Sequence, residues 1–339
     1  MTGAVDRLWY GRGRPLWPLW PAACLYRSIT RRRRDQLQQS QDSLPVPVIV
    51  VGNITAGGTG KSPLTAWLVH LLQQHGWRPV ILTRGYGAKG IHAPVLVTSA
   101  ASADQVGDEP LMLAAQTGCP VVVDPDRLRG ARWALQQELG NILVCDDGLQ
   151  HYRLPRTLEI AVFDGARGVG NGAPIPVGPL REPVSRLQNV DFVVVNGAPG
   201  AAVPGHDSRF TMNLEPVALT NLMTAEQQPL SWLSGRDVSA VAGIGNPERF
   251  FATLRSLGAR VTGVGMPDHH RFRPADLLPG QGPVIITAKD AVKARQYGHP
   301  ACWILEVEAQ LPDSFGAALL ARLNGQNLNG AGPRASRQN

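Results

Sequence analysis

The sequence predicts an α/β fold with a mostly parallel sheet and helices on both faces, and three observations lead to it. Short apolar runs recur from residue 46 onward, helix-like stretches such as Pro63–His75 and Pro110–Thr117 separate several of them, and a glycine-rich turn joins the first run to the first helix. β-branched runs that alternate with helices are typical of parallel strands covered on both faces. The predicted strands of this series are Val46–Val51, Val80–Thr83, Val95–Val97, Val121–Val123, Ile142–Val144, Ile160–Phe163 and Phe192–Val195.

A change in composition near residue 225 predicts a smaller α/β domain on the C-terminal side. The polar stretch Met223–Gln228 precedes new apolar runs that begin near Val238 and include Val261–Val264 and Val284–Thr287. The last residues are rich in Asn, Gly, Ser and Arg, which is typical of a frayed end. We therefore expect a membrane-interface segment, a core, a smaller α/β domain and a flexible tail at residues 1–40, 41–225, 226–325 and 326–339.

The positive charge of the chain is concentrated at its N-terminal end. The formal net charge is +7, and residues 1–35 alone carry eight arginines against Asp6 and Asp35, a net charge of +6. The rest of the chain is nearly neutral and therefore gives no indication of a nucleic-acid-binding surface. The four cysteines are widely scattered and form no Cys-x-x-Cys pair, which argues against a disulfide framework or a zinc site.

The basic N-terminal segment also holds an apolar stretch. Arginines flank the uncharged run Pro15–Tyr26, which contains Trp17 and Trp20, and Trp9 and Tyr10 precede it. Tryptophan and tyrosine favour the membrane–water interface, arginines favour anionic headgroups, and the run is too short to span a bilayer. We expect peripheral contact with an anionic membrane surface. A soluble helical cap and a signal peptide are the alternatives, and the prolines of the run disfavour the signal peptide.

A glycine-rich loop between a predicted strand and a predicted helix has the pattern of a phosphate-binding loop. Residues 48–62 end in Gly-Lys-Ser, and Thr55 stands where the Walker A motif has its first glycine. The backbone N–H groups of such a loop point at phosphate oxygens, Lys61 would reach the β- and γ-phosphates, and Ser62 would bind Mg²⁺. The flanking elements disfavour a turn without a ligand and indicate a P-loop NTPase-like core. The predicted nucleotide-binding residues are Thr55, Ala56, Gly57, Gly58, Thr59, Gly60, Lys61 and Ser62.

Two adjacent carboxylates follow the predicted strand Ile142–Val144. Asp146 and Asp147 stand at its carboxyl end, which is the edge of a parallel sheet where ligands bind. An aspartate at this position of a Walker B site meets Mg²⁺, so the pair predicts a magnesium site. If the strand continues, the two side chains point to opposite sides and only one contacts the metal directly. An ordinary turn is the alternative, because Asp-Gly is a turn signal.

Eight short motifs follow one another along the chain: Gly52–Pro63, Thr83–Gly87, Val106–Pro110, Asp146–His151, Gly178–Pro183, Gly243–Pro247, Pro267–His270 and Thr287–Asp290. Together they resemble the tetraacyldisaccharide 4'-kinase family, the lipid A 4'-kinases of Gram-negative bacteria. Each motif is weak alone, but all eight occur in the family's order, and the resemblance extends from the N-terminal aromatic and arginine cluster to about Leu311. Two minor departures are Ser62, where threonine is commoner, and Ala288, where an acidic residue is commoner.

The resemblance implies an ATP-dependent kinase of lipid A biosynthesis. With Mg²⁺, it would transfer the γ-phosphate of ATP to the 4'-hydroxyl of a tetraacylated glucosamine disaccharide 1-phosphate. It would lie peripherally on the cytoplasmic face of the inner membrane, on anionic phospholipid, with no nucleic acid and no obligate protein partner. A membrane-associated regulatory P-loop ATPase is the alternative, disfavoured by Ala56 where those ATPases carry a second lysine. A GTP-using metallochaperone is a third reading, disfavoured by the lack of Cys/His ligand clusters.

On the acceptor side, the resemblance implies a catalytic role for Asp108. Its carboxylate would orient the acceptor hydroxyl and take its proton, and His269 would hydrogen-bond and tune that carboxylate, with His270 as the substitute. From the residues alone, Asp108 could equally cap a helix and His269 could be a solvated loop histidine. Because His269 belongs to the smaller domain, its contact with Asp108 would require the two domains to close.

On the nucleotide side, the resemblance implies that Arg181 joins Lys61 as a cation for the transferring phosphoryl group. Glu182 would then contact the metal or position Arg181. From the residues alone, Arg181 reads as a surface arginine in a proline-rich loop. The stretch Thr287–Asp290 is expected to be either a nucleotide-contacting or a domain-contacting element.

Overall fold

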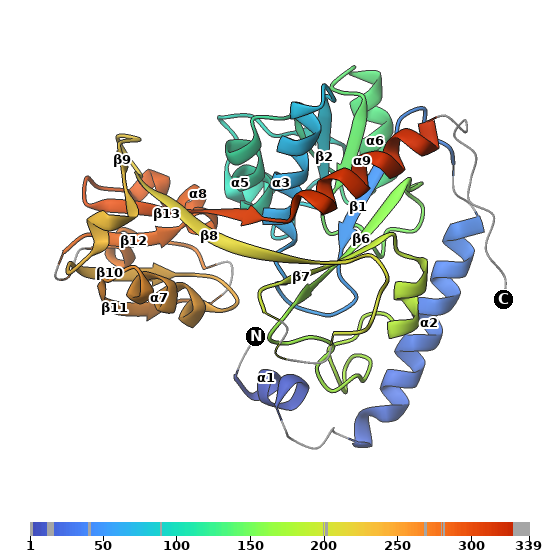
Figure 1. Cartoon of the computed structure of the whole chain (residues 1–339), viewed down its shortest axis with the longest axis horizontal. Coiled ribbons are helices and arrows are strands. Elements are labelled where there is room, and N and C mark those ends of the chain that lie inside the picture. The colour runs from blue at the N-terminus through green and yellow to red at the C-terminus, as the bar shows by residue number, and fades with distance from the viewer. Residues whose placement is uncertain are drawn as a thin grey trace.

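The computed structural model describes residues 3–11, 17–39, 42–88, 90–198, 200, 203–267, 270–278, 280 and 282–327. These residues form one continuous mixed sheet with helices on its faces (Figure 1). The strands are β1 Val48–Gly52, β2 Pro79–Thr83, β3 Val95–Leu96, β4 Val121–Val123, β5 Ile142–Cys145, β6 Leu158–Asp164, β7 Phe192–Asn196, β8 Arg209–Asn221, β9 Gln227–Gln228, β10 Asp237–Ala242, β11 Arg260–Gly265, β12 Val284–Thr287 and β13 Cys302–Gln310. The helices are α1 Gly3–Tyr10, α2 Trp20–Gln39, α3 Lys61–Gln74, α4 Ala103–Val106, α5 Asp108–Thr117, α6 Arg127–Gln136, α7 Pro247–Ser256, α8 Ala288–Ala294 and α9 Asp313–Asn327.

The larger half of the sheet carries the glycine-rich loop at its centre. Its strand order is β3-β4-β2-β5-β1-β6-β7-β8, and every pair except β3–β4 is parallel. Side chains of β1 alternate between the two faces. Ile49 and Val51 pack in a core cluster with residues of α3, α5 and α9, whereas Val48 and Val50 pack in another with residues of α6. The predicted α/β fold with helices on both faces is thereby confirmed.

The long strand β8 joins the larger half to a smaller half. Its first residues pair in parallel with β7, and its remaining residues pair antiparallel with β13. The smaller half continues through β12 and β10 to β11. Residues of α7 pack in the core cluster on one side of these strands, and residues of α8 pack in the cluster on the other side. Figure 1 shows β8 crossing the molecule between the two halves.

The sequence did not predict β8, although its residues alternate in burial along much of its length. Pro216 lies inside it, and a proline normally argues against an interior strand position. In the structure, Pro216 pairs with Val307 at the point where the register between β8 and β13 shifts. The bulge accommodates the proline and lets the strand run on.

Helix α9 packs on the larger half, whereas the predicted boundaries place most of it in the smaller domain. Phe315 of α9 contacts Phe192 of β7 with ring centroids 5.5 Å apart, and Trp67 of α3 at 5.4 Å. Figure 1 shows α9, in red, lying across the larger half. The chain therefore returns to the core after β13, which a division by sequence position alone misses.

Candidate active site

The glycine-rich loop lies between the end of β1 and the start of α3. Gly57 and Gly60 have φ of 106° and 92°, a region that residues with a side chain rarely adopt. A Cβ at Gly60 would lie 2.5 Å from Asn196 Nδ2. The Asn196 amide instead donates a hydrogen bond to the Thr59 carbonyl at 3.2 Å, and the Asn53 amide donates to the Gly57 carbonyl at 3.1 Å. The side chains of Asn53, just after β1, and Asn196, at the end of β7, thus fix the loop in one conformation.

A second loop, residues 174–182, lies along the glycine-rich loop. The Ala56 N–H donates to the Pro179 carbonyl at 2.7 Å, and the Arg181 N–H donates to the Ile54 carbonyl at 2.8 Å. These backbone bonds bring the predicted cation Arg181 beside the start of α3.

Asp146 lies at the carboxyl end of β5 and is almost fully buried. The Ser62 hydroxyl donates to Asp146 Oδ2 at 3.4 Å, and the Thr65 hydroxyl donates to Asp146 Oδ1 at 2.9 Å. Burial, with the negative charge of Glu109, raises the pKa of Asp146 to about 7, while the charge of Lys61 acts in the opposite direction. Lys61 therefore does not offset the burial and the negative charge that favour the protonated, neutral form of Asp146.

Asp147 faces the cations of the site. Its Oδ1 lies 3.4 Å from Lys61 Nζ and 3.7 Å from Arg181 Nη1. Burial acts to raise its pKa, but Lys61 and Arg181 hold the pKa of Asp147 below its usual range. Its φ of 50° turns the chain away from the strand direction. The two aspartates thus have different neighbours, with only Asp146 contacting Ser62.

The residues present fit a magnesium nucleotide. The Thr59 hydroxyl oxygen is buried and has no hydrogen-bond partner among the described residues, which suits a donor aimed at a phosphate. No group of three or more His, Cys, Asp and Glu side chains among the described residues could hold a metal ion by itself. Mg²⁺ is commonly held by one or two carboxylates together with phosphate oxygens and water, so the pair at 146–147 with Ser62 suits it.

Asp108 is the first residue of α5 and is buried. Gly107, with φ of 93°, occupies the N-cap position, although Asp108 Oδ1 still accepts the Glu109 N–H at 3.0 Å. The predicted partner His269 lies outside the described residues. The substitute, His270, lies with Nε2 2.9 Å from Asp276 Oδ2. That carboxylate belongs to the smaller half, so His270 has a partner of its own.

Glu182 lies in a buried network. Its carboxylate accepts hydrogen bonds from the Gln150 amide, at 2.7 Å, and from the Tyr152 hydroxyl, and it lies 3.6 Å from Arg186 Nε. No contact joins it to Ser62 or to the aspartate pair among the described residues. The arrangement suits a residue that fixes the loop carrying Arg181, and metal binding by Glu182 stays a prediction.

Sequence reasoning missed several residues of this region. Thr65 lies one helical turn beyond Ser62, and Asn196 ends β7, a strand whose carboxyl end meets the same edge of the sheet. Glu109 follows Asp108 directly and faces Lys289 Nζ at 3.2 Å. The positions of Thr65, Asn196 and Glu109 relative to the predicted site residues and strand ends could have indicated these three residues from the sequence. The lysines of α8 come from the other half of the sheet, and nothing in the local sequence pairs them with α5.

The N-terminal helices lie against the site. Trp9 donates its indole N–H to the Pro176 carbonyl at 3.1 Å, and the Tyr10 hydroxyl donates to the Ala56 carbonyl at 3.0 Å. The polar atoms of both aromatic side chains therefore bind the two loops of the site, and the expected role of this segment at a membrane interface stays a prediction. Burial raises the pKa of Tyr26 in α2, and the charge of Arg181 acts against it. Helix α2 thus passes close to Arg181.

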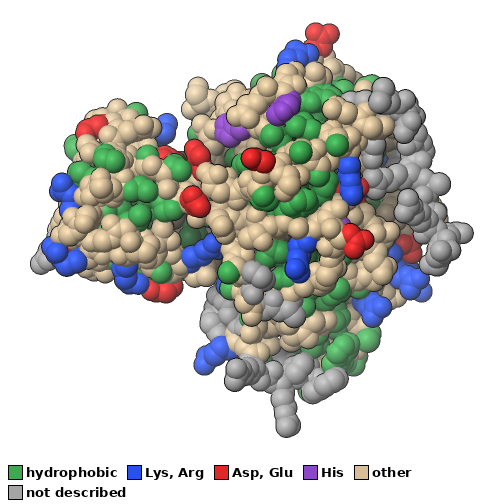
Figure 2. Space-filling model, viewed as in Figure 1, with side chains coloured by type: hydrophobic (Ala, Val, Ile, Leu, Met, Phe, Trp, Pro, Cys, Tyr) green, Lys and Arg blue, Asp and Glu red, His purple; other side chains and the backbone are tan. Residues whose placement is uncertain are grey.

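The outer face of α2 is apolar and basic. Leu25 and Ile29, one turn apart, are 62% and 55% exposed, and Ala23 is buried against the loop at 173–177. In Figure 2, apolar and basic side chains lie next to one another along the edge of the molecule that α2 forms. Among the described residues, no helix is long and apolar enough to cross a membrane.

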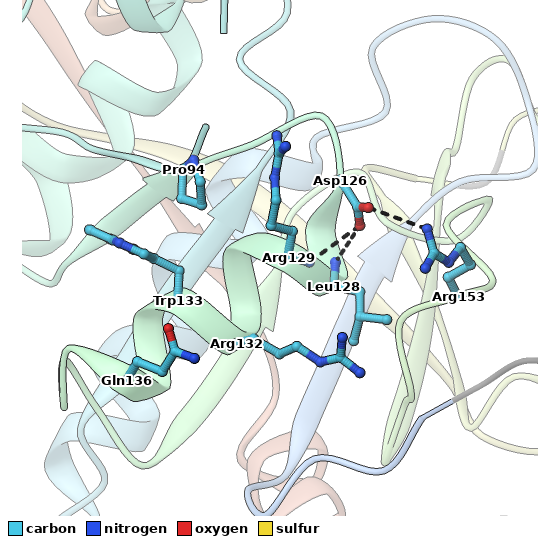
Figure 3. Close-up of a pocket in the computed structure, with 8 residues that line it drawn as sticks. All are labelled: Pro94, Asp126, Leu128, Arg129, Arg132, Trp133, Gln136 and Arg153. Carbon is cyan, nitrogen blue, oxygen red and sulfur yellow. Dashed lines mark hydrogen bonds and ion pairs between the residues drawn. The ribbon is translucent and has the colours of Figure 1, made fainter. Parts of the chain in front are cut away.

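A separate hollow of about 280 Å³ lies along α6 (Figure 3). Its arginines are engaged by carboxylates: Arg129 binds Asp124, and Arg153 binds Asp126, which also caps α6. None of the predicted site residues lines it. Because its charges are already paired, this hollow is a poor phosphate site and does not compete with the glycine-rich loop.

Comparison with known proteins agrees with the motifs. The tetraacyldisaccharide-1-P 4'-kinase family matches residues 15–324. The tetraacyldisaccharide 4'-kinase of Legionella pneumophila (strain Lens) is 46% identical over 317 residues, which cover 93% of this chain and 96% of the relative. The enzyme of the same name from Azotobacter vinelandii is 44% identical over 332 residues, covering 94% and 98%.

Among solved structures, the LpxK protein of Aquifex aeolicus in complex with ATP superimposes with a TM-score of 0.76. It is 27% identical, and the match covers 90% of this chain and 98% of that one. The family match over residues 15–324 and the 46% and 44% identity with relatives that are covered almost in full establish that this chain belongs to the tetraacyldisaccharide-1-P 4'-kinase family.

Proposed function

We propose that this chain transfers the γ-phosphate of ATP to the 4'-hydroxyl of a tetraacylated glucosamine disaccharide 1-phosphate. The observation that carries the proposal is the convergence of Lys61, Arg181 and the aspartates 146 and 147 beside the glycine-rich loop. Membership of a family named for this reaction supports the acceptor, and the ATP in the Aquifex aeolicus relative supports the donor.

On the nucleotide side, Lys61 and Arg181 bind the phosphates. Both face Asp147, and an incoming triphosphate offers them negatively charged oxygens. The loop at 55–60 supplies backbone N–H groups and the unpartnered Thr59 hydroxyl. Ser62 and the aspartate pair would hold Mg²⁺, and the ion would supply positive charge that offsets the charge of the phosphates. Positioning and charge stabilisation of this kind account for most of phosphoryl-transfer catalysis.

On the acceptor side, Asp108 orients the 4'-hydroxyl and takes its proton. The hydroxyl oxygen forms a new bond to the γ-phosphorus, the bond from that phosphorus to the β-phosphate oxygen breaks, and ADP leaves. A base in a buried position at the start of a helix suits this step, because water is kept away from the transferring group. His269 is proposed as the partner of Asp108, although it lies outside the described residues.

A further part of the proposal is that α2 docks on the cytoplasmic leaflet of the inner membrane. Its exposed Leu25 and Ile29 side chains would enter the interface, and its arginines would meet anionic headgroups. Because α2 passes close to Arg181, docking would bring a lipid acceptor to the phosphoryl-transfer site.

The kinase reading is tested against the regulatory ATPase by adding the acceptor. ATP turnover by the purified protein is expected to depend strongly on added tetraacyl disaccharide 1-phosphate. Turnover that is the same with and without that lipid, and that instead responds to vesicles alone, would favour the regulatory ATPase.

The magnesium site predicts a pH dependence. With the pKa of Asp146 raised to about 7, a proton competes with Mg²⁺ for this carboxylate at lower pH. The Mg²⁺ concentration for half-maximal activity should rise as the pH falls through about 7 and level off above it. Glu109→Gln removes one cause of the raised pKa and should move this rise to lower pH. A half-maximal concentration that is constant from about pH 6 to about pH 8 would contradict the assignment of Asp146 to the metal.

The α2 surface predicts electrostatic docking. Replacing Arg31–Arg34 with Gln should weaken binding to vesicles that contain anionic phospholipid and raise the apparent KM for the lipid acceptor, with the KM for ATP unchanged. Each interfacial arginine is worth about 1 kcal/mol on such a surface, and salt screens this attraction. Salt should therefore weaken vesicle binding by the wild-type protein more than vesicle binding by the variant.

A control variant loses the same charge elsewhere. It carries Gln at four exposed arginines outside α2, and its binding should stay close to wild type. Equal vesicle binding by the α2 variant and the wild type across the salt range would show that α2 is an ordinary solvated face. The control positions are Arg236, Arg255, Arg260 and Arg271.

A further inference from the structure

A lysine from the smaller half of the sheet points its charge at Asp108. Lys293 of α8 has a side chain that is 9% exposed, and its Nζ lies 3.7 Å from Asp108 Oδ2. The same Nζ lies 2.9 Å from Asp290 Oδ1 and 5.4 Å from the ring centre of Phe272. Lys293 is thus enclosed by groups of its own half on one side and by the carboxylate of α5 on the other.

Asp290 is fixed independently of Lys293. It is fully buried, and its Oδ2 accepts hydrogen bonds from the Gly243 N–H at 2.9 Å and from the Thr287 hydroxyl at 2.8 Å. Two motifs of the sequence, Gly243–Pro247 and Thr287–Asp290, therefore meet at this carboxylate. Their meeting anchors the lysine whose ammonium faces α5.

The Lys293 ammonium still has hydrogen-bonding capacity. Although it is buried and within ion-pair distance of two carboxylates, its Nζ makes no hydrogen bond of regular geometry among the described residues. A buried charged donor of this kind is costly unless it is used. A small approach of the two halves would convert the 3.7 Å contact with Asp108 into a hydrogen bond.

We propose that Lys293 is a positioning residue for phosphoryl transfer. It orients the Asp108 carboxylate and favours its ionised form, and both effects require α8 of the smaller half to be packed against α5. The inference rests on the proposed function, in which Asp108 takes the proton of the acceptor hydroxyl. Burial disfavours a charged carboxylate, and a buried ammonium at short distance offsets that effect. Lys293 acts through Asp108 and does not itself contact the reacting atoms.

Among the described residues, Lys293 is the cation that an ion pair places beside Asp108. Glu109 has its own partner, Lys289 of α8, at 3.2 Å, and Asp290 carries the same sign of charge as Asp108. The Lys293 side chain is also less exposed than that of Lys289, at 9% against 17%. The remaining charged or titratable residues on helices packed against α5 are Asp104 of α4 and Lys61 and His70 of α3.

The pair Lys289–Glu109 supplies a matched control. It joins the same two helices and is also a lysine–carboxylate pair, but it does not involve Asp108. Lys293→Met should lower kcat for lipid phosphorylation about tenfold to a hundredfold, with the KM for ATP nearly unchanged. This loss is smaller than the roughly hundredfold to ten-thousandfold that general-base catalysis supplies, because the base itself is kept. Lys289→Met should lower kcat by less than about fivefold, as expected for a partly exposed ion pair.

The pH profile separates positioning from simple docking of the two halves. At saturating Mg²⁺, Lys293→Met should move the acid limb of kcat/KM for the lipid to higher pH, because Asp108 without its cation is protonated more readily. Lys289→Met should leave that limb where it is. Lys293→Arg keeps the positive charge and should restore the limb, even if kcat recovers only in part.

A second variant controls for the possibility that Lys293→Met loses activity because it unfolds. Lys293→Met alone leaves the buried Asp290 carboxylate without its cation, so the double variant Asp290→Asn/Lys293→Met removes that charge as well. The new amide side chain would need only its carbonyl oxygen for the Gly243 and Thr287 hydrogen bonds. Circular dichroism and thermal unfolding check the fold of each variant, and the double variant should show the same shifted acid limb as Lys293→Met.

Two results would overturn the inference: an unshifted acid limb in a folded Lys293→Met variant, or equal losses of kcat for Lys293→Met and Lys289→Met. Either result would mean that Lys293 only holds the two halves together. Such a result would not touch the proposed function. The base assignment fails separately, if Asp108→Ala retains lipid phosphorylation.

Discussion

Lys61→Ala is expected to abolish phosphoryl transfer and leave the fold intact. The lysine begins α3, its side chain lies outside the core clusters, and its Nζ lies 3.4 Å from Asp147 beside the glycine-rich loop. Removing it deletes the cation that binds the β- and γ-phosphates, whose charge must be stabilised as the bond to the leaving group breaks. A cation that stabilises the transition state of phosphoryl transfer is worth about a thousandfold or more in kcat, so a loss of that size is expected.

The double change Asp146→Asn/Asp147→Asn should have the same effect through the metal. At position 146 the substitution puts a neutral isostere in place of a buried carboxylate whose pKa is raised, so it should cost little stability in the absence of Mg²⁺. At position 147 it removes the carboxylate that faces Lys61 and Arg181, so a modest loss of stability is expected there. Transfer is measured with purified protein, and thermal unfolding reports the fold. Lys289→Ala is the control, because it also removes a lysine near the start of a helix that faces a carboxylate. Near-normal turnover in folded Lys61 or Asp146/Asp147 variants would show that the nucleotide site is wrongly assigned.

Asp108→Ala should lower kcat about a hundredfold to ten-thousandfold with little change in the KM for ATP, as expected when a general base is lost. Asp108→Asn is the sharper variant. Its amide oxygen can still accept the Glu109 N–H that Asp108 accepts in the structure, but it cannot take a proton. If the only role of Asp108 is to accept the Glu109 N–H at the start of α5, the Asp108→Asn variant will retain activity. If Asp108 is the base, both variants will lose it.

His269→Ala should lower kcat in the same way but less severely. Because the two residues are proposed to act as one unit, the double variant should be little worse than Asp108→Ala alone. Additive losses would mean that the two residues act independently, and the proposed pair would then be wrong.

Features set by a short stretch of chain could be predicted from the sequence. The glycine-rich loop needs a strand, a tight turn and a helix within a few residues, and all three leave a local pattern at β1 and α3. The strands of the larger half are buried on both faces, so they appear as continuous apolar runs.

Features set by distant contacts could not be predicted in this way. Pro216 hides the long strand β8, because the bulge that accommodates it exists only once β13 has paired. Nothing in the local sequence shows that the polar atoms of Trp9 and Tyr10 bind the loops at 176 and 56. Lys293 is a further case, because its proposed role depends on contact with Asp108, a residue of the other half.

The most direct test of the proposed reaction follows the phosphate itself. The purified protein is incubated with ATP labelled in its γ-phosphate, Mg²⁺ and a tetraacyl glucosamine disaccharide 1-phosphate in mixed micelles, and the lipid is separated and its phosphate positions are determined. We predict that the label appears in a bis-phosphorylated lipid, at the 4'-position, and that Lys61→Ala and Asp108→Ala remove it. Consumption of ATP by the wild-type protein with release of labelled inorganic phosphate and no label in the lipid would contradict the proposed reaction.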